Sequence, residues 1–393
     1  MPDLTVKYFN SGMTGAPQIA NNWGDLVSML DACLVNGFAL KAIDTLTSAG
    51  GIATATISSG HAYRPDQVVL IAGAEQPEYN GQFRVLTTTT TTFTFAVTGT
   101  PASPATTTSS LSAKVAPLGW EKPFAGTNKA AYRSKNPQSP QNLLLIDNSL
   151  KTPGYTTSWA KWANVGIVED LADIDTIVGA QAPYDPNNPT QNWKQVAANQ
   201  WGWYKWYHAR QAGYDNSGDN GGGNRNWVLV GDDRLFFLFC STAAGYGWYG
   251  RSSYCFGDIT SFKPGDNYAT VLCAEDVYWS NSSSGYTSYP GQFNNYGLVS
   301  SLDFSGKVLL RNHTQLGNPV RFGVTSLNTN NGQQICGRGP TPFPNGADYS
   351  LWLLPTYVRQ EDGHIRGLMP GMLWMPQDRP YSDQTIVDNV VGQ

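Results

Sequence analysis

Paired acidic residues are the part of this sequence that could carry out hydrolytic chemistry. Doublets considered for such a role are Glu169-Asp170, Asp232-Asp233 and Glu275-Asp276. Two carboxylates on either side of a sugar are the machinery of glycosidases, and the many Trp and Tyr residues could hold that sugar. Adjacent residues of a strand point to opposite faces, so a doublet is not itself a catalytic pair. The doublets are therefore compatible with a glycosidase but do not predict one.

Other catalytic and metal-binding patterns are missing from the sequence. The four histidines have none of the HxH, HExxH or HxxxH spacings of metal sites, and neither the GxSxG nucleophile elbow nor the GxxxxGK[ST] phosphate loop occurs. The run DNSGDN at 215–220 offers oxygen ligands but lacks the spacing and the closing Glu of a calcium loop. We therefore predict that the protein is not an enzyme and has no catalytic residue, no cofactor and no metal site.

Aromatic rings crowd one stretch of the chain, which we call the aromatic patch. A sugar-binding platform would need these rings exposed side by side, whereas a protein core or a subunit interface needs only burial. We favour a core or interface role and predict symmetric oligomerisation through this face. The residues of the aromatic patch are Trp201, Trp203, Tyr204, Trp206 and Tyr207.

Composition excludes several classes of protein. Only 14% of the 393 residues are charged, against a usual ~25%, and the net charge is −4. The few Lys and Arg residues are scattered, which predicts no binding to nucleic acid. No run approaches the ~18 apolar residues of a membrane span. The first 15 residues lack the basic and apolar regions of a signal peptide, and five cysteines without a CxxC pair predict buried free thiols in a reducing cytosol.

The first 115 residues predict one helix and then a small β module. Apolar residues at Leu26, Leu30, Cys33 and Leu34 follow helical spacing within 22–37, with Asn22 as the N-cap and a stop at Gly37. Period-two patterns with turn signals between them predict a small β-sandwich or barrel. The threonine run 87–92 suits an exposed hairpin. The predicted strands are 52–57, 67–72, 82–86, 92–97 and 110–115.

After Pro117 the chain becomes rich in Trp, Gly and Asn. The pattern predicts a helix over 191–211, loops at 215–224 and 280–291, and an extended arm beyond Gly371. The fold class is therefore mainly β (α+β), with residues 1–45 and 116–393 forming a main body and 46–115 an inserted domain. The strands predicted in the main body are 142–147, 227–230, 234–240, 269–274, 307–311, 320–324 and 351–357.

Five segments resemble a family of virion proteins that tailed bacteriophages and prophages of Gram-negative bacteria encode. They read SGMTGAP at 11–17, LDACLVNGF at 30–38, GWEKPFAGTNKAAYR at 119–133, WVLVGDDRLFF at 227–237 and RGLMPG at 366–371. Residues 45–115 resemble a small β module of phage tail and virion proteins, and the chain departs from the family pattern at 372–376. The resemblance implies a place in the phage particle and brings no catalytic residues with it.

These observations predict a structural component of a tailed-phage virion, assembled in the host cytoplasm. We expect a tail or baseplate component whose partners are copies of itself and other virion proteins. One alternative is a capsid decoration or head–tail junction (collar) protein. Another is a glycan-binding receptor-recognition protein or depolymerase, which would need exposed coplanar rings beside an acid pair and would bind a host surface glycan.

Overall fold

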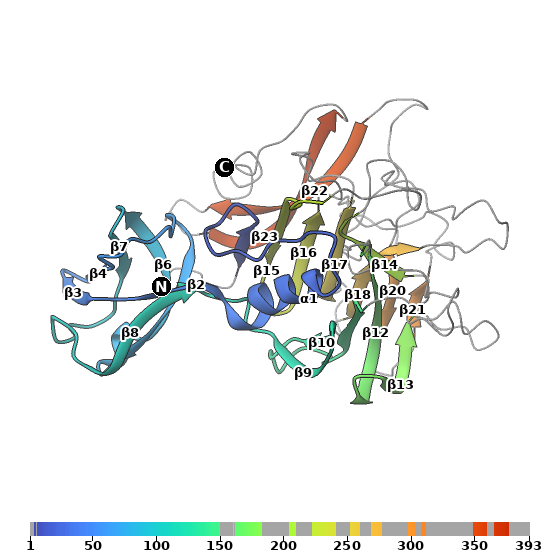
Figure 1. The fold of residues 1–393 in the computed structure, drawn as a ribbon, viewed down its shortest axis with the longest axis horizontal. Helices are drawn as coiled ribbons and strands as arrows, with labels where there is room; N and C mark the ends of the chain where they lie inside the picture. The colour runs from blue at the N-terminus through green and yellow to red at the C-terminus, as the bar shows by residue number, and fades with distance from the viewer. Residues whose placement is uncertain are drawn as a thin grey trace.

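The chain folds mainly into antiparallel β-sheets, as the sequence predicts, and the described residues include one short α-helix (Figure 1). The computed structural model describes the chain from residue 4 to residue 376, with gaps. The described residues are 4, 6–149, 160, 162–182, 204–209, 222–240, 252–259, 269–276, 298–302, 308–311, 349–359 and 365–376.

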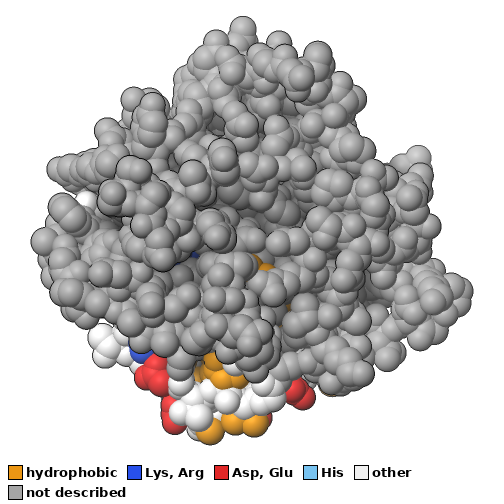
Figure 2. Space-filling view, turned by 90° about the vertical axis from the view of Figure 1, so that its right-hand side faces the viewer, with side chains coloured by type: hydrophobic (Ala, Val, Ile, Leu, Met, Phe, Trp, Pro, Cys, Tyr) orange, Lys and Arg blue, Asp and Glu red, His pale blue; other side chains and the backbone are white. Residues whose placement is uncertain are grey.

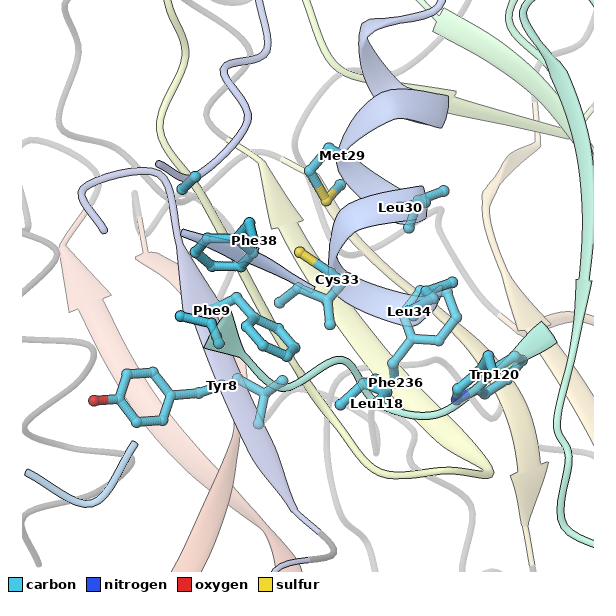
Figure 3. Packing of buried hydrophobic residues seen from close by; sticks show 14 of the residues in the cluster. Tyr8, Phe9, Met29, Leu30, Cys33, Leu34, Phe38, Leu118, Trp120 and Phe236 are labelled. Atoms are coloured by element: carbon cyan, nitrogen blue, oxygen red, sulfur yellow. The ribbon is translucent and has the colours of Figure 1, made fainter. Parts of the chain in front are cut away.

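The predicted helix is present and packs one face on the core. It consists of α1 (Asp25–Leu30), which continues as a π-helical turn, η1 (Asp31–Asn36). The chain leaves it at Gly37 with a φ of 71°, a left-handed value that favours glycine. A Cβ at this position would also lie 2.3 Å from the Val115 carbonyl oxygen. Figure 3 shows the buried face of the helix beside the strands, with Met29, Leu30, Cys33 and Leu34 near Phe9, Phe38 and Leu118.

The predicted N-cap of the helix is wrong, because Asn22 does not cap it. Gly24 occupies the N-cap position and has no side chain that could cap the helix. A residue far along the chain provides the capping group instead. The amide oxygen of Asn148 accepts hydrogen bonds from the backbone N–H groups of Gly24, at 2.9 Å, and Leu26, at 3.3 Å. Asn148 thus satisfies two of the N–H groups that a helix start leaves without intrahelical partners.

Replacing Asn148 with Ala should therefore cost far more stability than replacing Asn22. Asn148 is fully buried, and its amide nitrogen also meets the ring of His208 at 3.1 Å and the Trp162 carbonyl oxygen at 3.3 Å. We expect Asn148→Ala to lower the free energy of unfolding by about 2 kcal/mol, because buried partners are left unsatisfied. Denaturant titration measures the effect, and Asn22→Ala is the matched control, expected to change stability by less than about 0.5 kcal/mol. Equal losses in the two variants would contradict this assignment of the cap.

A curled seven-stranded sheet, called the small sheet below, follows the helix and lies to the left in Figure 1. Its order is β2-β8-β5-β6-β7-β4-β3. Ala105, just before β8, donates a backbone hydrogen bond of 2.7 Å to Leu46 of the opposite edge strand, so the sheet curls around its own core. The strands are β2 (Phe38–Ala42), β3 (Thr45–Ala49), β4 (Ile52–Thr56), β5 (Val68–Ala74), β6 (Gly81–Thr88), β7 (Thr92–Ala96) and β8 (Thr107–Val115), with a 3-10 turn η2 (Pro77–Tyr79).

All five strands predicted in this region are confirmed, and so is the threonine hairpin. Residues Thr89–Thr91 connect β6 to β7, and the Thr87 and Thr94 hydroxyls hydrogen-bond at 2.7 Å across the exposed face. Strand β2, which ends before residue 46, pairs with β8 and belongs to the same sheet. The division of the chain into domains at 46 and 115 stays a prediction.

The main body contains two large sheets, drawn in the centre and right of Figure 1. The first runs β1 (Lys7–Asn10), β15 (Trp227–Gly231), β16 (Leu235–Cys240), β17 (Ser252–Ile259), β18 (Ala269–Cys273), β20 (Leu298–Leu302) and β21 (Val308–Arg311). The second runs β19 (Glu275–Asp276), β14 (Tyr204–Tyr207), β12 (Trp162–Asp173), β11 (Leu143–Asp147), β10 (Lys129–Arg133) and β9 (Glu121–Gly126), with β13 (Thr176–Ala182) on β12. A separate hairpin pairs β22 (Tyr349–Arg359) with β23 (Ile365–Pro376).

Most main-body predictions are confirmed, and two are wrong in part. Six of the seven predicted strands are present, while 320–324 lies outside the described residues. The helix predicted over 191–211 is wrong at Tyr204–Tyr207, which form strand β14. Three of these four residues are aromatic, which suits a strand of one sheet that packs against another sheet. This packing outweighs the helical spacing of the sequence. The start of the arm predicted beyond Gly371 is also wrong, since residues 372–376 belong to β23. The loop predicted at 280–291 lies outside the described part.

Aromatic rings join the two large sheets into one core. Trp206 of β14 stacks on Tyr254 of β17, with ring centroids 5.4 Å apart, and meets Phe236 of β16 edge-on at 6.1 Å. Trp120, next to β9, contacts Phe236 in the same way at 5.3 Å. These rings are buried, and they form the core between the two packed sheets.

The β12–β13 hairpin lies at the lower right of Figure 1 and carries an exposed mixed surface. Val178 of β13 is 47% exposed, and Glu169 and Asp170 of β12 are exposed beside it. Figure 2 shows the same combination at the lower end of the face it views, where hydrophobic side chains lie among acidic ones.

Candidate functional site

The Asp232-Asp233 doublet shapes a turn. It lies between β15 and β16, where one Asp232 carboxylate oxygen accepts hydrogen bonds from the backbone N–H groups of Arg234, at 2.8 Å, and Leu235, at 2.9 Å. The Asp233 carboxylate accepts a hydrogen bond of 3.1 Å from the Asn136 side chain. Burial raises the pKa of Asp232, although both backbone donors lower it. These contacts give the doublet the role of a polar turn cap.

Lys7 is buried beside this turn. Burial lowers the pKa of its ammonium group to about 8, although the Asp233 and Asp232 carboxylates act in the opposite direction. The guanidinium of Arg84 from the small sheet lowers it further. Arg84 itself donates a hydrogen bond of 2.6 Å to the Asp66 carbonyl oxygen. The charges of Lys7 and Arg84 therefore lie where the small sheet meets the main body.

The other two doublets lie on different strands. Glu169 and Asp170 are exposed near the far end of β12, and Glu275 and Asp276 make up the two-residue strand β19. Strand β19 pairs with Tyr204 and Lys205 of β14. The three doublets thus occupy a hairpin, a turn and an edge strand.

Three residues of the aromatic patch are core residues of the single chain. Tyr204 and Trp206 are fully buried, and Tyr207 is 1% exposed. The Tyr207 backbone N–H donates to the Tyr254 hydroxyl oxygen at 2.6 Å, and this hydroxyl donates to the Tyr207 carbonyl oxygen at 3.2 Å. These three rings offer no exposed surface for the alternative role, a sugar-binding platform. Trp201 and Trp203 lie outside the described residues, so oligomerisation through the patch stays a prediction.

Sequence reasoning missed a row of polar residues that crosses the second large sheet. Residues directly opposite each other in neighbouring strands share a face, and the register joins five of them in one line, called the polar row. Its three central side chains are buried, at 7% exposure for Asp147, 0% for Asn164 and 2% for Lys205. The signal in the sequence was a Lys inside an aromatic run and an Asn inside an apolar strand. In order, the polar row is Lys129, Asp147, Asn164, Lys205 and Glu275.

The members of the polar row differ in how well their polar atoms are partnered. The ammonium nitrogen of Lys205 lies 4.6 Å from the ring centroid of Trp162, which is 2% exposed. Asp147 accepts a hydrogen bond of 2.9 Å from the Ser149 backbone N–H. Neither the side-chain oxygen nor the side-chain nitrogen of Asn164 has a hydrogen-bond partner, although both atoms are buried. A buried amide without partners is costly, which marks Asn164 as the unusual member of the row.

His208 lies just after β14 and is held neutral. Its pKa is lowered to about 3, first by complete burial and then by the nearby Arg225, while a hydrogen bond with the Ala20 backbone acts in the opposite direction. Its ring meets the Asn148 amide at 3.1 Å. His208 therefore connects the second sheet to the start of helix α1. His61 of the small sheet stacks on Tyr63, and His313 and His364 lie outside the described residues.

The described residues offer no metal site, reactive thiol or large cavity. No three His, Cys, Asp or Glu side chains there are grouped as a metal would require, and no helix there is long and apolar enough to cross a membrane. Cys33, Cys240 and Cys255 are buried free thiols, and burial raises the pKa of Cys33 and Cys240. A cavity of about 10 Å³ beside Met13, Tyr63 and Gln67 has room for one water.

Comparisons with known proteins leave the chain without an assigned family. No protein-family model matches it, and no curated protein matches it. Among solved structures, it is similar to the phage phi92 endosialidase, with a TM-score of 0.19 and 12% sequence identity. The likeness covers 84% of this chain and 62% of that protein, so the chain spans about three fifths of that protein's length. A TM-score this low supports no conclusion about fold or function.

Proposed function

We propose that the chain is a non-enzymatic structural subunit of a tailed-bacteriophage particle. It belongs to the tail or baseplate and acts through contacts with copies of itself and with other virion proteins. The resemblance of five sequence segments to phage virion proteins suggests this location, and the low charge and high aromatic content suit a subunit that buries its surface against neighbours.

One structural observation carries the non-enzymatic part of the proposal. Described side chains that could have built an active site instead hold the fold together: Asp232 caps a turn, His208 is buried and neutral, and Trp206 joins two sheets. A catalytic acid or base has to reach substrate, and buried structural contacts prevent that for these residues. The mainly antiparallel sheets provide the rigid body that a subunit of a large assembly needs.

Immunogold labelling of purified particles of the parent phage tests the proposal. An antibody against this chain should place gold at the tail or baseplate, and the denatured particles should contain the chain on a blot. Particles from a phage that lacks the gene provide the control for antibody specificity.

The outcomes separate the alternatives. Gold over the capsid or neck would move the protein to capsid decoration or the head–tail junction. Denatured particles without the chain would overturn the structural proposal and make a host-glycan depolymerase or lectin the next hypothesis to test.

A further inference from the structure

The centre of the polar row places a lysine directly opposite an asparagine. Asn164 of β12 and Lys205 of β14 are register partners in an antiparallel pair. Such partners have Cβ atoms roughly 5 Å apart on the same face of a sheet. The flexible four-carbon side chain of a lysine can span that gap and bring its nitrogen to the side-chain carbonyl carbon of the asparagine.

The surroundings of this pair are buried and contain an acid. Both residues are buried, and Trp162, two residues before Asn164 on the same face, covers the Lys205 nitrogen. Asp147 is the register partner of Asn164 on its other side, in strand β11, and is 7% exposed. Water excluded from such a site cannot compete as nucleophile for the amide.

The unpartnered amide of Asn164 is the observation that needs an explanation. A buried asparagine normally satisfies its oxygen and nitrogen, yet both are without hydrogen-bond partners here. An amide that condenses with the facing lysine would lose its nitrogen, and with it one of the two unsatisfied atoms. Without a covalent bond between the two side chains, burying the unpaired amide costs free energy and nothing offsets that cost.

We propose that Lys205 and Asn164 join in an intramolecular isopeptide bond, with the Asp147 carboxyl carrying the proton. The neutral amine of Lys205 forms a bond from Nζ to Cγ of Asn164. One amine proton passes by way of the Asp147 carboxyl to Nδ2, the Cγ–Nδ2 bond breaks, and ammonia leaves. The product is a secondary amide, no oxidant or reductant takes part, and the Asp147 carboxyl is regenerated.

The bond would tie two strands that are separated by a long stretch of chain. Residues 165–204 would become a covalently closed loop, and β12 could no longer separate from β14. Closing a loop of this length restricts the unfolded chain, as a disulfide does, without depending on redox conditions. The proposal concerns the chemistry of this sheet and does not depend on where the protein acts.

The mass of the intact full-length protein tests the proposal directly. The wild-type chain should be lighter than its sequence mass by about 17 Da, one ammonia. Lys205→Arg and Asn164→Ala should each have the full mass of their own sequences. The Lys205→Arg variant is the essential control, because succinimide formation at the Asn-Gly pairs, such as Asn80-Gly81, also releases ammonia but does not need Lys205.

Peptide mapping gives the second, independent reading. Trypsin should leave a branched peptide in which residues 162–194 are joined to 195–210, because a modified Lys205 resists cleavage. Asp147→Asn should leave most of the protein without the branch, and an unchanged branch in that variant would overturn the role of Asp147. A wild-type protein of full sequence mass that gives separate linear peptides for Asn164 and Lys205 would overturn the bond itself.

Discussion

The Trp206→Ala variant should lose about 4 kcal/mol of stability, the largest loss expected from any single substitution considered for this chain. Trp206 is fully buried, stacks on Tyr254 and meets Phe236 edge-on, so it contacts both neighbouring strands of the opposite sheet. Its removal leaves a cavity between two rigid sheets, and sheets cannot close together around the loss of one ring.

Denaturant unfolding of the wild type and its variants, followed by circular dichroism, measures this loss. Trp206→Phe keeps an aromatic ring and should lose less than half as much, whereas Val178→Ala, at a side chain 47% exposed, should stay within about 0.5 kcal/mol of the wild type. A Trp206→Ala loss below about 1 kcal/mol would show that the ring is not a core residue of the folded chain.

Acid should destabilise the protein through His208. Its pKa in the folded chain is about 3, below the ordinary value of 6.5, so the unfolded state binds more protons than the folded state between these values. Stability contributed by neutral His208 is therefore fully present above about pH 6.5 and decreases as the pH falls toward 3. Between pH 7 and pH 4 this single group should cost about 3 kcal/mol.

A comparison of the wild type with His208→Gln isolates this effect from the titration of the carboxylates. Glutamine does not titrate and can still reach the Asn148 amide, which the His208 ring meets at 3.1 Å. The stability of the wild type minus that of the variant should fall by about 3 kcal/mol between pH 7 and pH 4. If the two proteins show the same pH dependence, His208 does not remain neutral in the folded state.

Local patterns were enough to predict five of the seven strands of the small sheet, but not β2 and β3. Strands such as Thr92–Ala96 alternate apolar and polar residues, and their Phe93 and Phe95 rings are fully buried while the threonines between them are not. The stop at Gly37 was predictable for a similar reason, since its φ of 71° favours glycine. These features depend on the residues themselves and their nearest neighbours.

Longer-range features could not be predicted in this way. The helical spacing of 191–211 failed at Tyr204–Tyr207, because packing between two sheets outweighs local preference where aromatic residues are dense. The polar row also escaped notice, since Asp147, Asn164 and Lys205 come from three strands, and their alignment depends on the pairing register.

The sequence by itself determined the mainly β class, the packing face of the helix and five of the seven strands of the small sheet. Hydrophobic periodicity fixes which side of such an element is buried. The tertiary structure alone decided the helix cap, where Asn148 replaces the local candidate Asn22 from 124 residues away. It also decided the turn role of Asp232 and the meeting of Asn164 with Lys205. Hydrogen-bonding partners far apart in the chain are chosen by how sheets pair and pack, which no local pattern encodes.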